Sequence, residues 1–134
     1  MRLAMLVLGL FLAVPGTAHA SQGNMTVADF LARAYVLKAR GFTALFSEDY
    51  RLLKREAAAA ANAYTIRLAS ERTAGRPSSC PPRSVKVNSD LVIGYLETYP
   101  HSVRGRTSLV QAVTDYYQRN WPCTGGTQLA RFPR

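Results

Sequence analysis

Few residues of this sequence have side chains suited to catalysis or metal binding, and the sulfur and imidazole groups among them are Cys80, Cys123, His19 and His101. A closed zinc site of cysteine and histidine needs four ligands, and His19 lies in an apolar leader, so we expect no metal site. A Ser-His-Asp triad would have to use His101, but no serine has a nucleophile-elbow pattern around it. We therefore predict no catalytic residues, no metal and no cofactor, and a protein that is not an enzyme.

The first 20 residues have the pattern of a secretory signal peptide. Met1-Arg2 is a short basic start, residues 3–14 are an apolar run, and Ala18-His19-Ala20 is a small-x-small cleavage site. The apolar run is shorter than the roughly 20 residues that a spanning helix needs, so we expect no stable membrane insertion. We predict cleavage after Ala20 and export to the periplasm, with an uncleaved anchor as the alternative.

Cleavage would leave residues 21–134, a length of 114 residues that suits one domain. The whole chain carries 17 Lys and Arg against 8 Asp and Glu, for a formal charge of +9, and the leader contributes only Arg2 to this excess. Such a charge would suit nucleic acid, but export separates the chain from nucleic acid, so we expect an acidic protein or envelope surface as the partner. The chain also lacks the length and the glycine-rich turns of Rossmann and TIM-barrel enzymes.

Export also changes the interpretation of the two cysteines. Disulfides form in oxidising compartments, and an exported chain with two cysteines can form only one bridge within itself. We therefore predict a disulfide between Cys80 and Cys123. Two free thiols, or a bridge between two chains, are the alternatives.

Four segments have apolar residues at helical spacing and capping residues before them. The first follows the cap Thr26 and ends at Gly41, and the second follows Ser47 and runs to about residue 73. The third follows Asn88 or Ser89 and ends before Pro100, and the fourth follows Thr107 or Ser108 and ends at residues 121–123. The expected apolar face of the first helix consists of Val27, Phe30, Leu31, Ala34 and Tyr35.

These segments predict an all-α fold, a small bundle of about four helices in one domain over residues 21–134. Residues 72–83 and 101–106 are expected to be loops, and residues 124–134 a tail. If sequential helices are antiparallel, Cys80 precedes the third helix and Cys123 follows the fourth at the same end. The disulfide is then expected to close the C-terminal helical hairpin.

The C-terminal half combines several short motifs, namely Cys80-Pro81-Pro82, Val92-Ile93-Gly94-Tyr95-Leu96-Glu97, Pro100, Ser108-Leu109-Val110, Ala112-Val113 and Trp121-Pro122-Cys123. Over residues 80–123 this combination resembles the Rap/Tai family of type VI secretion system amidase immunity proteins. The first predicted helix, with Asp29-Phe30-Leu31, resembles the opening helix of that family more loosely. Many members carry an additional cysteine pair between their first two helices, which this chain lacks.

The resemblance implies a small, exported, mostly helical protein that inhibits without chemistry. Members of the family bind peptidoglycan-cleaving amidase effectors in the periplasm and block the active-site cleft, often as homodimers. A cognate cell-wall amidase effector is therefore the expected partner. Residues 99–106 and 72–83, which both contain arginine, are the candidates for presenting the contact, because arginine and tyrosine are enriched at binding hot spots. The residues expected to bind the partner are Tyr99, His101, Arg104, Arg106 and Arg76.

Two other functions fit an exported basic helical domain. A small periplasmic acid-stress chaperone would have to unfold when its carboxylates are protonated, and 8 acidic residues give it little leverage. An envelope-binding protein would use its positive charge on anionic lipid or lipopolysaccharide, and its binding would weaken with salt.

Overall fold

The computed structural model describes residues 23–123, so the predicted signal peptide (1–20) and the predicted tail (124–134) lie outside the described residues. The described part contains five α-helices, one 3-10 helix and no β-strand. The all-α prediction is therefore confirmed. In chain order the elements are α1 (Val27–Arg40), η1 (Gly41–Phe46), α2 (Glu48–Thr73), α3 (Ser89–Glu97), α4 (His101–Arg104) and α5 (Leu109–Asn120).

The four longer helices begin where the sequence places a capping side chain. Thr26 and Ser47 cap α1 and α2 as predicted, and of the alternatives for α3 and α5 the structure selects Asn88 and Ser108. Each cap accepts a hydrogen bond from a backbone N–H of the first turn, which otherwise has no partner within the helix. Helix α1 ends at Gly41, whose φ of +63° is a conformation that favours glycine.

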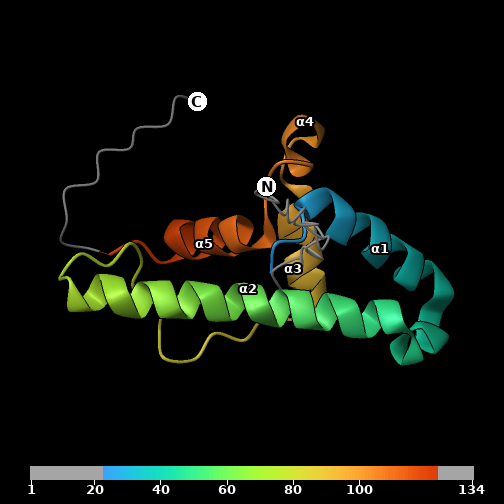
Figure 1. Ribbon diagram of the computed structural model, residues 1–134, viewed down its shortest axis with the longest axis horizontal. Coiled ribbons are helices and arrows are strands. Elements are labelled where there is room, and N and C mark those ends of the chain that lie inside the picture. The colour runs from blue at the N-terminus through green and yellow to red at the C-terminus, as the bar shows by residue number, and fades with distance from the viewer. Residues whose placement is uncertain (1–22, 124–134) are drawn as a thin grey trace, which may run out of the picture.

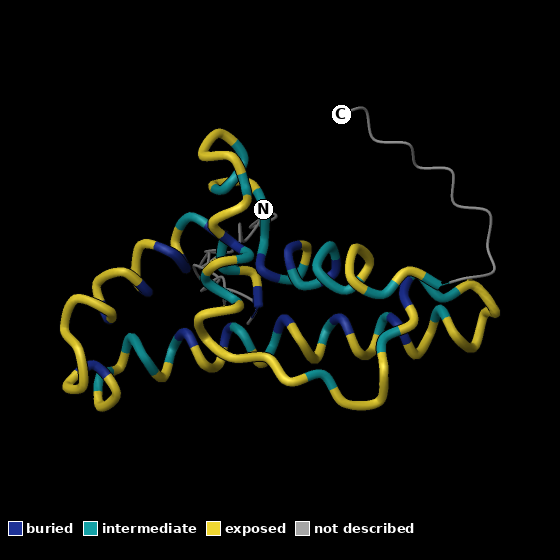
Figure 2. Tube along the Cα trace, turned by 180° about the vertical axis from the view of Figure 1, so that it is seen from behind, coloured by how far each residue is buried: buried dark blue, intermediate teal, exposed yellow. Residues whose placement is uncertain are grey.

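Helix α2 is the longest element, and α1, η1 and α5 pack along it, whereas α3 and α4 contact α1 (Figure 1). Its 26 residues span about 39 Å. Helix α1 and η1 fold back over its first half, whereas α5 lies along its second half and runs in the same direction. Buried positions recur along α2 on the side that faces the other helices (Figure 2). The core lies where these helices meet and includes Val27, Phe30, Leu31, Ala60, Leu96, Leu109 and Ala112.

The disulfide between Cys80 and Cys123 is present, with 4.9 Å between the two Cα atoms. It joins the segment after α2 to the end of α5, and the backbone N–H of Cys80 also donates to the Trp121 carbonyl oxygen at 2.8 Å. The sequence predicts that the bridge closes a hairpin of the last two long helices, but α5 packs along α2, and α3 lies at a steep angle to both. The bridge therefore closes the α2–α5 pair. A smooth alanine face makes this pairing possible, since Ala60 and Ala112 are both fully buried.

Aromatic side chains fill the space between α2 and α5 beyond the alanine face. The ring of Tyr64 from α2 stacks on that of Tyr117 from α5, with 4.2 Å between the centroids. Trp121 extends this layer, with its centroid 5.4 Å from Tyr117 and 5.7 Å from Tyr116. Such aromatic pairs stabilise a fold by more free energy than the burial of their apolar area alone would give. The layer therefore holds the end of α5 near the disulfide.

The starts of α1 and α5 are tied together by backbone hydrogen bonds. The N–H of Val27 donates to the Thr107 carbonyl oxygen at 2.9 Å, and the N–H of Leu109 donates to the Met25 carbonyl oxygen at 2.9 Å. These bonds form a short antiparallel bridge between the capping residues Thr26 and Ser108. The first N–H groups of a helix have no partner within that helix, and here those of Val27 and Leu109 find partners in the other segment.

A buried carboxylate holds the segment before α1 against the middle of α2. Oε2 of Glu56 accepts hydrogen bonds from the backbone N–H groups of Gly23, at 2.7 Å, and Met25, at 3.3 Å. Gly23 approaches the α2 backbone so closely that a Cβ atom there would lie 3.2 Å from the nitrogen of Ala60. Glycine is therefore required by both this contact and its φ of +88°.

Three local predictions differ from the structure. Residues 101–106, expected as a loop, contain the short helix α4. Tyr35, expected in the apolar face of α1, is 44% exposed, and Leu37 is buried instead. The Tyr35 hydroxyl donates to a Glu97 carboxylate oxygen at 2.8 Å, which gives a surface tyrosine a polar partner. Residues 41–46, for which the sequence predicted no element, form η1.

We expect the double variant C80S/C123S to lower the free energy of unfolding by about 4 kcal/mol. The bridge closes a separation of 43 residues, and the chain-entropy model gives about this value for such a loop. Urea unfolding followed by circular dichroism measures the difference. A loss below about 1 kcal/mol would contradict the assignment of the bridge as a main support of the α2–α5 pair.

We expect Glu56→Ala to destabilise the fold by about 2 kcal/mol or more, because one buried and one partly buried N–H group lose their acceptor. Glu56→Gln keeps one acceptor oxygen and should cost less. The matched control is Glu48→Ala, since the Glu48 side chain is 77% exposed and its removal should change stability by less than about 0.5 kcal/mol. Equal unfolding midpoints in urea for Glu56→Ala and Glu48→Ala would show that Glu56 does not anchor the segment.

Candidate binding surface

The structure brings four of the five predicted partner-binding residues together and separates the fifth. Tyr99, His101, Arg104 and Arg106 lie in the turn between α3 and α5, which contains α4. This turn projects from the body of the molecule (Figure 1). Arg76 follows the end of α2, and that end of α2 lies away from α4 (Figure 1). The two predicted loops are therefore separate surfaces.

Tyr99 supports the fold of the projecting turn. Its hydroxyl donates to a carboxylate oxygen of Asp115 on α5 at 2.8 Å and lies 3.2 Å from the hydroxyl of Tyr95. Burial raises the pKa of Tyr99 well above its usual range, and the hydrogen bonds to Tyr95 and Asp115 raise the pKa further. A half-buried tyrosine with these partners holds α3 against α5, and its hydroxyl is already engaged.

Arg104 closes the C-terminal end of α3. Its Nε donates to the Tyr99 carbonyl oxygen at 2.7 Å, and its Nη2 donates to the Glu97 carbonyl oxygen at 2.7 Å. The last carbonyl groups of a helix have no partner within the helix, and a cation near them is favourable. The guanidinium therefore fixes α4 relative to α3, and it is half-buried in doing so.

His101 and Arg106 remain exposed at the projecting turn, together with Pro100, Ser102 and Gly105. Backbone bonds support the turn from within, because the N–H of Arg106 donates to the Val103 carbonyl oxygen at 3.1 Å. The Thr107 hydroxyl donates to the same carbonyl at 2.9 Å. We name residues 100–106 the α4 knob. It is a braced projection that presents one imidazole and one guanidinium to solvent.

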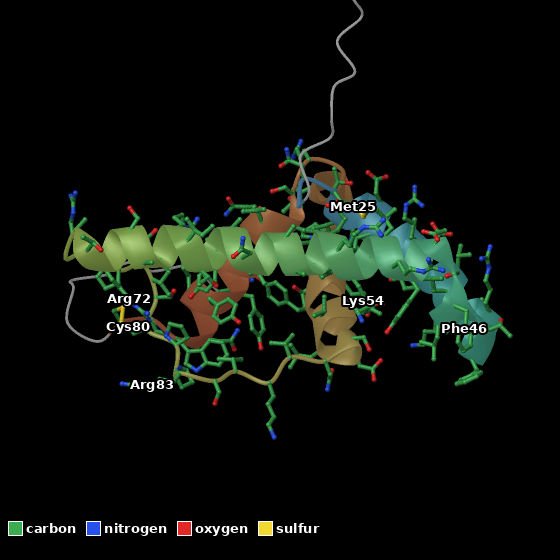
Figure 3. The ribbon with its side chains drawn as sticks, turned by 60° about the horizontal axis from the view of Figure 1, so that its bottom comes forward. Met25, Phe46, Lys54, Arg72, Cys80 and Arg83 are labelled. Atoms are coloured by element: carbon green, nitrogen blue, oxygen red, sulfur yellow. A yellow bond between two sulfur atoms is a disulfide. The ribbon has the colours of Figure 1, made fainter. Side chains whose placement is uncertain are left out.

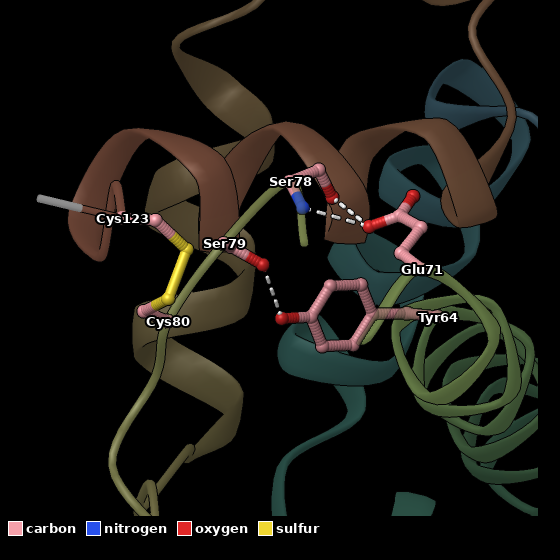
Figure 4. The surroundings of a disulfide bond; sticks show 6 residues. All are labelled: Tyr64, Glu71, Ser78, Ser79, Cys80 and Cys123. Atoms are coloured by element: carbon pink, nitrogen blue, oxygen red, sulfur yellow. Dashed lines mark hydrogen bonds between the residues drawn. A yellow bond between two sulfur atoms is a disulfide. The ribbon is translucent and has the colours of Figure 1, made fainter. Parts of the chain in front are cut away.

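The other predicted loop is held by hydrogen bonds at the two residues just before Cys80 of the disulfide (Figure 4). A carboxylate oxygen of Glu71 accepts from the N–H of Ser78 at 2.8 Å and from its hydroxyl at 2.5 Å. These bonds hold the pKa of Glu71 below its usual range. The buried Ser79 hydroxyl lies 2.7 Å from the Tyr64 hydroxyl. Arg76 is exposed at the start of this braced loop.

One exposed surface was missed by the sequence prediction. Phe42 and Phe46 of η1 are 76% and 71% exposed, and their rings make an edge-to-face contact with centroids 5.8 Å apart. Leu45 between them is 45% exposed. We name these three residues the aromatic corner, and Figure 3 shows Phe46 at the opposite end of the molecule from Cys80. The sequence could have indicated this surface by its three large apolar residues, which lie in a segment whose apolar residues follow neither a clear helical nor a clear strand spacing.

The comparisons with known proteins identify no relative of this chain. No family model matches the sequence, and no curated protein and no solved structure matches it. Membership of the Rap/Tai family therefore stays a prediction from the motifs of residues 80–123.

No helix within residues 23–123 is long and apolar enough to cross a membrane. In the same part of the chain, no three His, Cys, Asp or Glu side chains are grouped so that they could hold a metal ion.

Three half-buried tyrosines predict a loss of stability in alkali. Burial raises the pKa of Tyr95, Tyr99 and Tyr117 above the ordinary value of 10.0, so the folded protein holds these protons more tightly than the unfolded chain. Their contribution to the free energy of unfolding is complete below about pH 10. It is lost as the pH rises from there towards the pKa values that these tyrosines have in the folded protein. We expect helical circular dichroism to fall and tyrosinate absorbance to rise in one step above pH 10.

Tyr99→Phe should reduce this pH dependence, because the variant has one fewer buried phenol. At pH 7 it should be less stable than the unaltered protein by about 1 kcal/mol, since the bond to Asp115 is lost. The stability difference should then narrow between pH 10 and pH 12, as measured by urea unfolding at each pH. A constant difference would show that Tyr99 does not titrate with unfolding.

Proposed function

We propose that this chain is an exported immunity protein that binds a periplasmic peptidoglycan amidase effector of type VI secretion and occludes its active site without catalysis. The observation that carries this proposal is the α4 knob, a braced projection with exposed His101 and Arg106 (Figure 1). The motif resemblance over residues 80–123 supplies the class of partner. The knob lies within that segment.

The shape of the knob suits insertion into an enzyme cleft. Active sites are concave, so a protein that blocks one needs a convex element to place in it. Ordering a flexible loop on binding costs free energy, and a loop that is already ordered avoids this cost. Arg104 and Tyr99 supply the order here, because they tie the knob to α3 and α5.

The charge of the chain fits an acidic partner surface. The whole sequence has 17 Lys and Arg against 8 Asp and Glu, and all 8 acidic residues lie within the described part. Several of those carboxylates are engaged within the chain, as at Glu56, Glu71 and Asp115. Complementary charge accelerates association and disfavours wrong partners. An amidase with an acidic cleft rim is therefore the expected target.

The disulfide is compatible with an oxidising compartment, where such bonds persist. The proposed place of action in the periplasm follows from the signal-peptide pattern of residues 1–20. A stapled helical scaffold suits an inhibitor in that compartment, because it resists unfolding while exposed to the envelope.

We expect a gene beside that of this chain to encode a secreted peptidoglycan amidase, and the product of that gene is the partner to assay. Purified protein should suppress peptidoglycan cleavage at a near-stoichiometric ratio and should elute with the amidase on size exclusion. Arg106→Glu should weaken inhibition by about 30-fold or more, because removing an arginine hot spot costs about 2 kcal/mol. His101→Glu should act in the same direction.

Two variants serve as controls. Arg55→Glu makes the same change of charge at an exposed position of α2, and F42S/F46S removes the aromatic corner; both should leave inhibition unchanged. Loss of inhibition in F42S/F46S but not in Arg106→Glu would place the contact on the aromatic corner and overturn the role of the knob. Absence of a complex and of inhibition would overturn the proposed function itself.

A further inference from the structure

A groove of about 490 Å³ lies between the second half of α1, η1, the first half of α2 and the start of α3. Its volume falls within the usual range for sites of small molecules, about 300–1,000 Å³. Most of its wall is aliphatic or aromatic, and the buried part of this wall includes Phe30, Ala34, Leu37, Ala44 and Leu53. An apolar groove of this size suits a hydrocarbon ligand.

A second, smaller cavity of about 150 Å³ lies beside this groove, towards α5. Its wall consists of alanine, aliphatic and aromatic side chains from α1, α2, α3 and α5, together with Val87 before α3. The two hollows have wall residues in common, namely Phe30, Ala57, Val87 and Val92. A narrow hydrocarbon chain could extend along the groove and reach this common wall. A partner protein with a flat surface could not reach it.

The edge of the groove carries positive charge. Lys38 of α1 and Lys54 of α2 both line it, and neither forms an ion pair with a described residue. The ammonium of Lys54 lies 5.6 Å from the ring centroid of Tyr50 in the same wall. Asp90 is the single acidic residue of the wall, so the two lysines leave a net charge of +1. One anionic headgroup would complement this edge.

We propose that the groove binds a free long-chain fatty acid, with the hydrocarbon tail along the apolar wall and the carboxylate near Lys38 and Lys54. The tail removes apolar surface from water on both sides of the contact, and the carboxylate neutralises the net charge of the edge. The groove borders the start of α3, whereas the α4 knob follows the other end of α3. The site is therefore separate from the surface of the proposed function.

The length of the tail should set the affinity. Each buried methylene contributes about 0.8 kcal/mol, which is about fourfold in the dissociation constant. We expect affinity to rise by up to about this factor for each methylene added from octanoate onwards, until the groove is full. Displacement of dansyl-labelled undecanoic acid from the purified protein, at concentrations below micelle formation, measures this series with palmitate as its reference member.

The alanine run of α2 offers a matched pair of variants. Ala57→Leu places three further carbon atoms in the wall common to both hollows and should weaken palmitate binding at least tenfold. Ala58→Leu makes the same change at the next residue, which is exposed and outside both walls, and should leave binding unchanged. Alanine and leucine both favour helix, so far-UV circular dichroism and the melting temperature should show that both variants are folded.

The lysines are tested by comparing an acid with an uncharged ligand of the same length. K38Q/K54Q should weaken palmitate binding by about tenfold and leave hexadecanol binding unchanged, because only the acid carries the charge that the lysines complement. Equal effects on both ligands would overturn the placement of the carboxylate.

Three results would overturn the proposal as a whole. These are no displacement of the dansyl probe by palmitate, equal losses in Ala57→Leu and Ala58→Leu, or an affinity that does not depend on chain length. A change from dimer to monomer in Ala57→Leu without fatty-acid binding would identify the groove as an interface between copies of the chain. None of these results bears on inhibition through Arg106, so the two proposals fail independently.

Discussion

Two short backbone stretches, residues 25–27 and 107–109, hold the helices in one arrangement. Their hydrogen bonds place the first turns of α1 and α5 side by side, and the Glu56 carboxylate fixes the first stretch on the middle of α2. Buried backbone groups without partners are costly, so these bonds specify position as well as adding stability. With the start of α5 placed there, its alanine face lies against Ala60, and the aromatic layer and the disulfide complete the pairing at its far end.

The two ends of α3 differ in a way that explains the two proposed sites. At its C-terminal end the guanidinium of Arg104 and the hydroxyl of Tyr99 occupy the available polar groups, and the chain there is braced and convex. At its N-terminal end, the start of α3 borders a hollow with a mostly apolar wall, which α1, η1 and the first half of α2 complete. A convex braced element suits recognition of a macromolecule, and an apolar hollow suits recognition of a small one.

Features of the fold that depend on residues close in sequence were predictable, whereas the pairing of helices far apart in sequence was not. Caps such as Thr26 and Ser47 and the helical spacing of apolar residues depend on neighbours in sequence, and the predicted bounds of α1 and α2 agree with the structure. The partner of α5 depends on contacts about 50 residues away, so antiparallel pairing with the preceding helix was the wrong default. At the predicted site, residue type indicated that Tyr99 and Arg104 bind a partner. In the fold, Asp115 already accepts from the Tyr99 hydroxyl, and two backbone carbonyl groups already accept from Arg104, which residue type could not indicate.

The parallel pairing of α5 with α2 also limits how the gene can be divided. The motifs of residues 80–123 suggest a module, yet the buried face of α5 rests on α2, which precedes that segment entirely. Expressed alone, the segment would expose Leu109, Ala112 and the ring of Tyr117 to water, with only α3 and α4 to cover them. A recombination crossover near Cys80 would join an α5 to an α2 with which it had not evolved. A unit that keeps the core of this fold therefore has to contain α2 as well as α5.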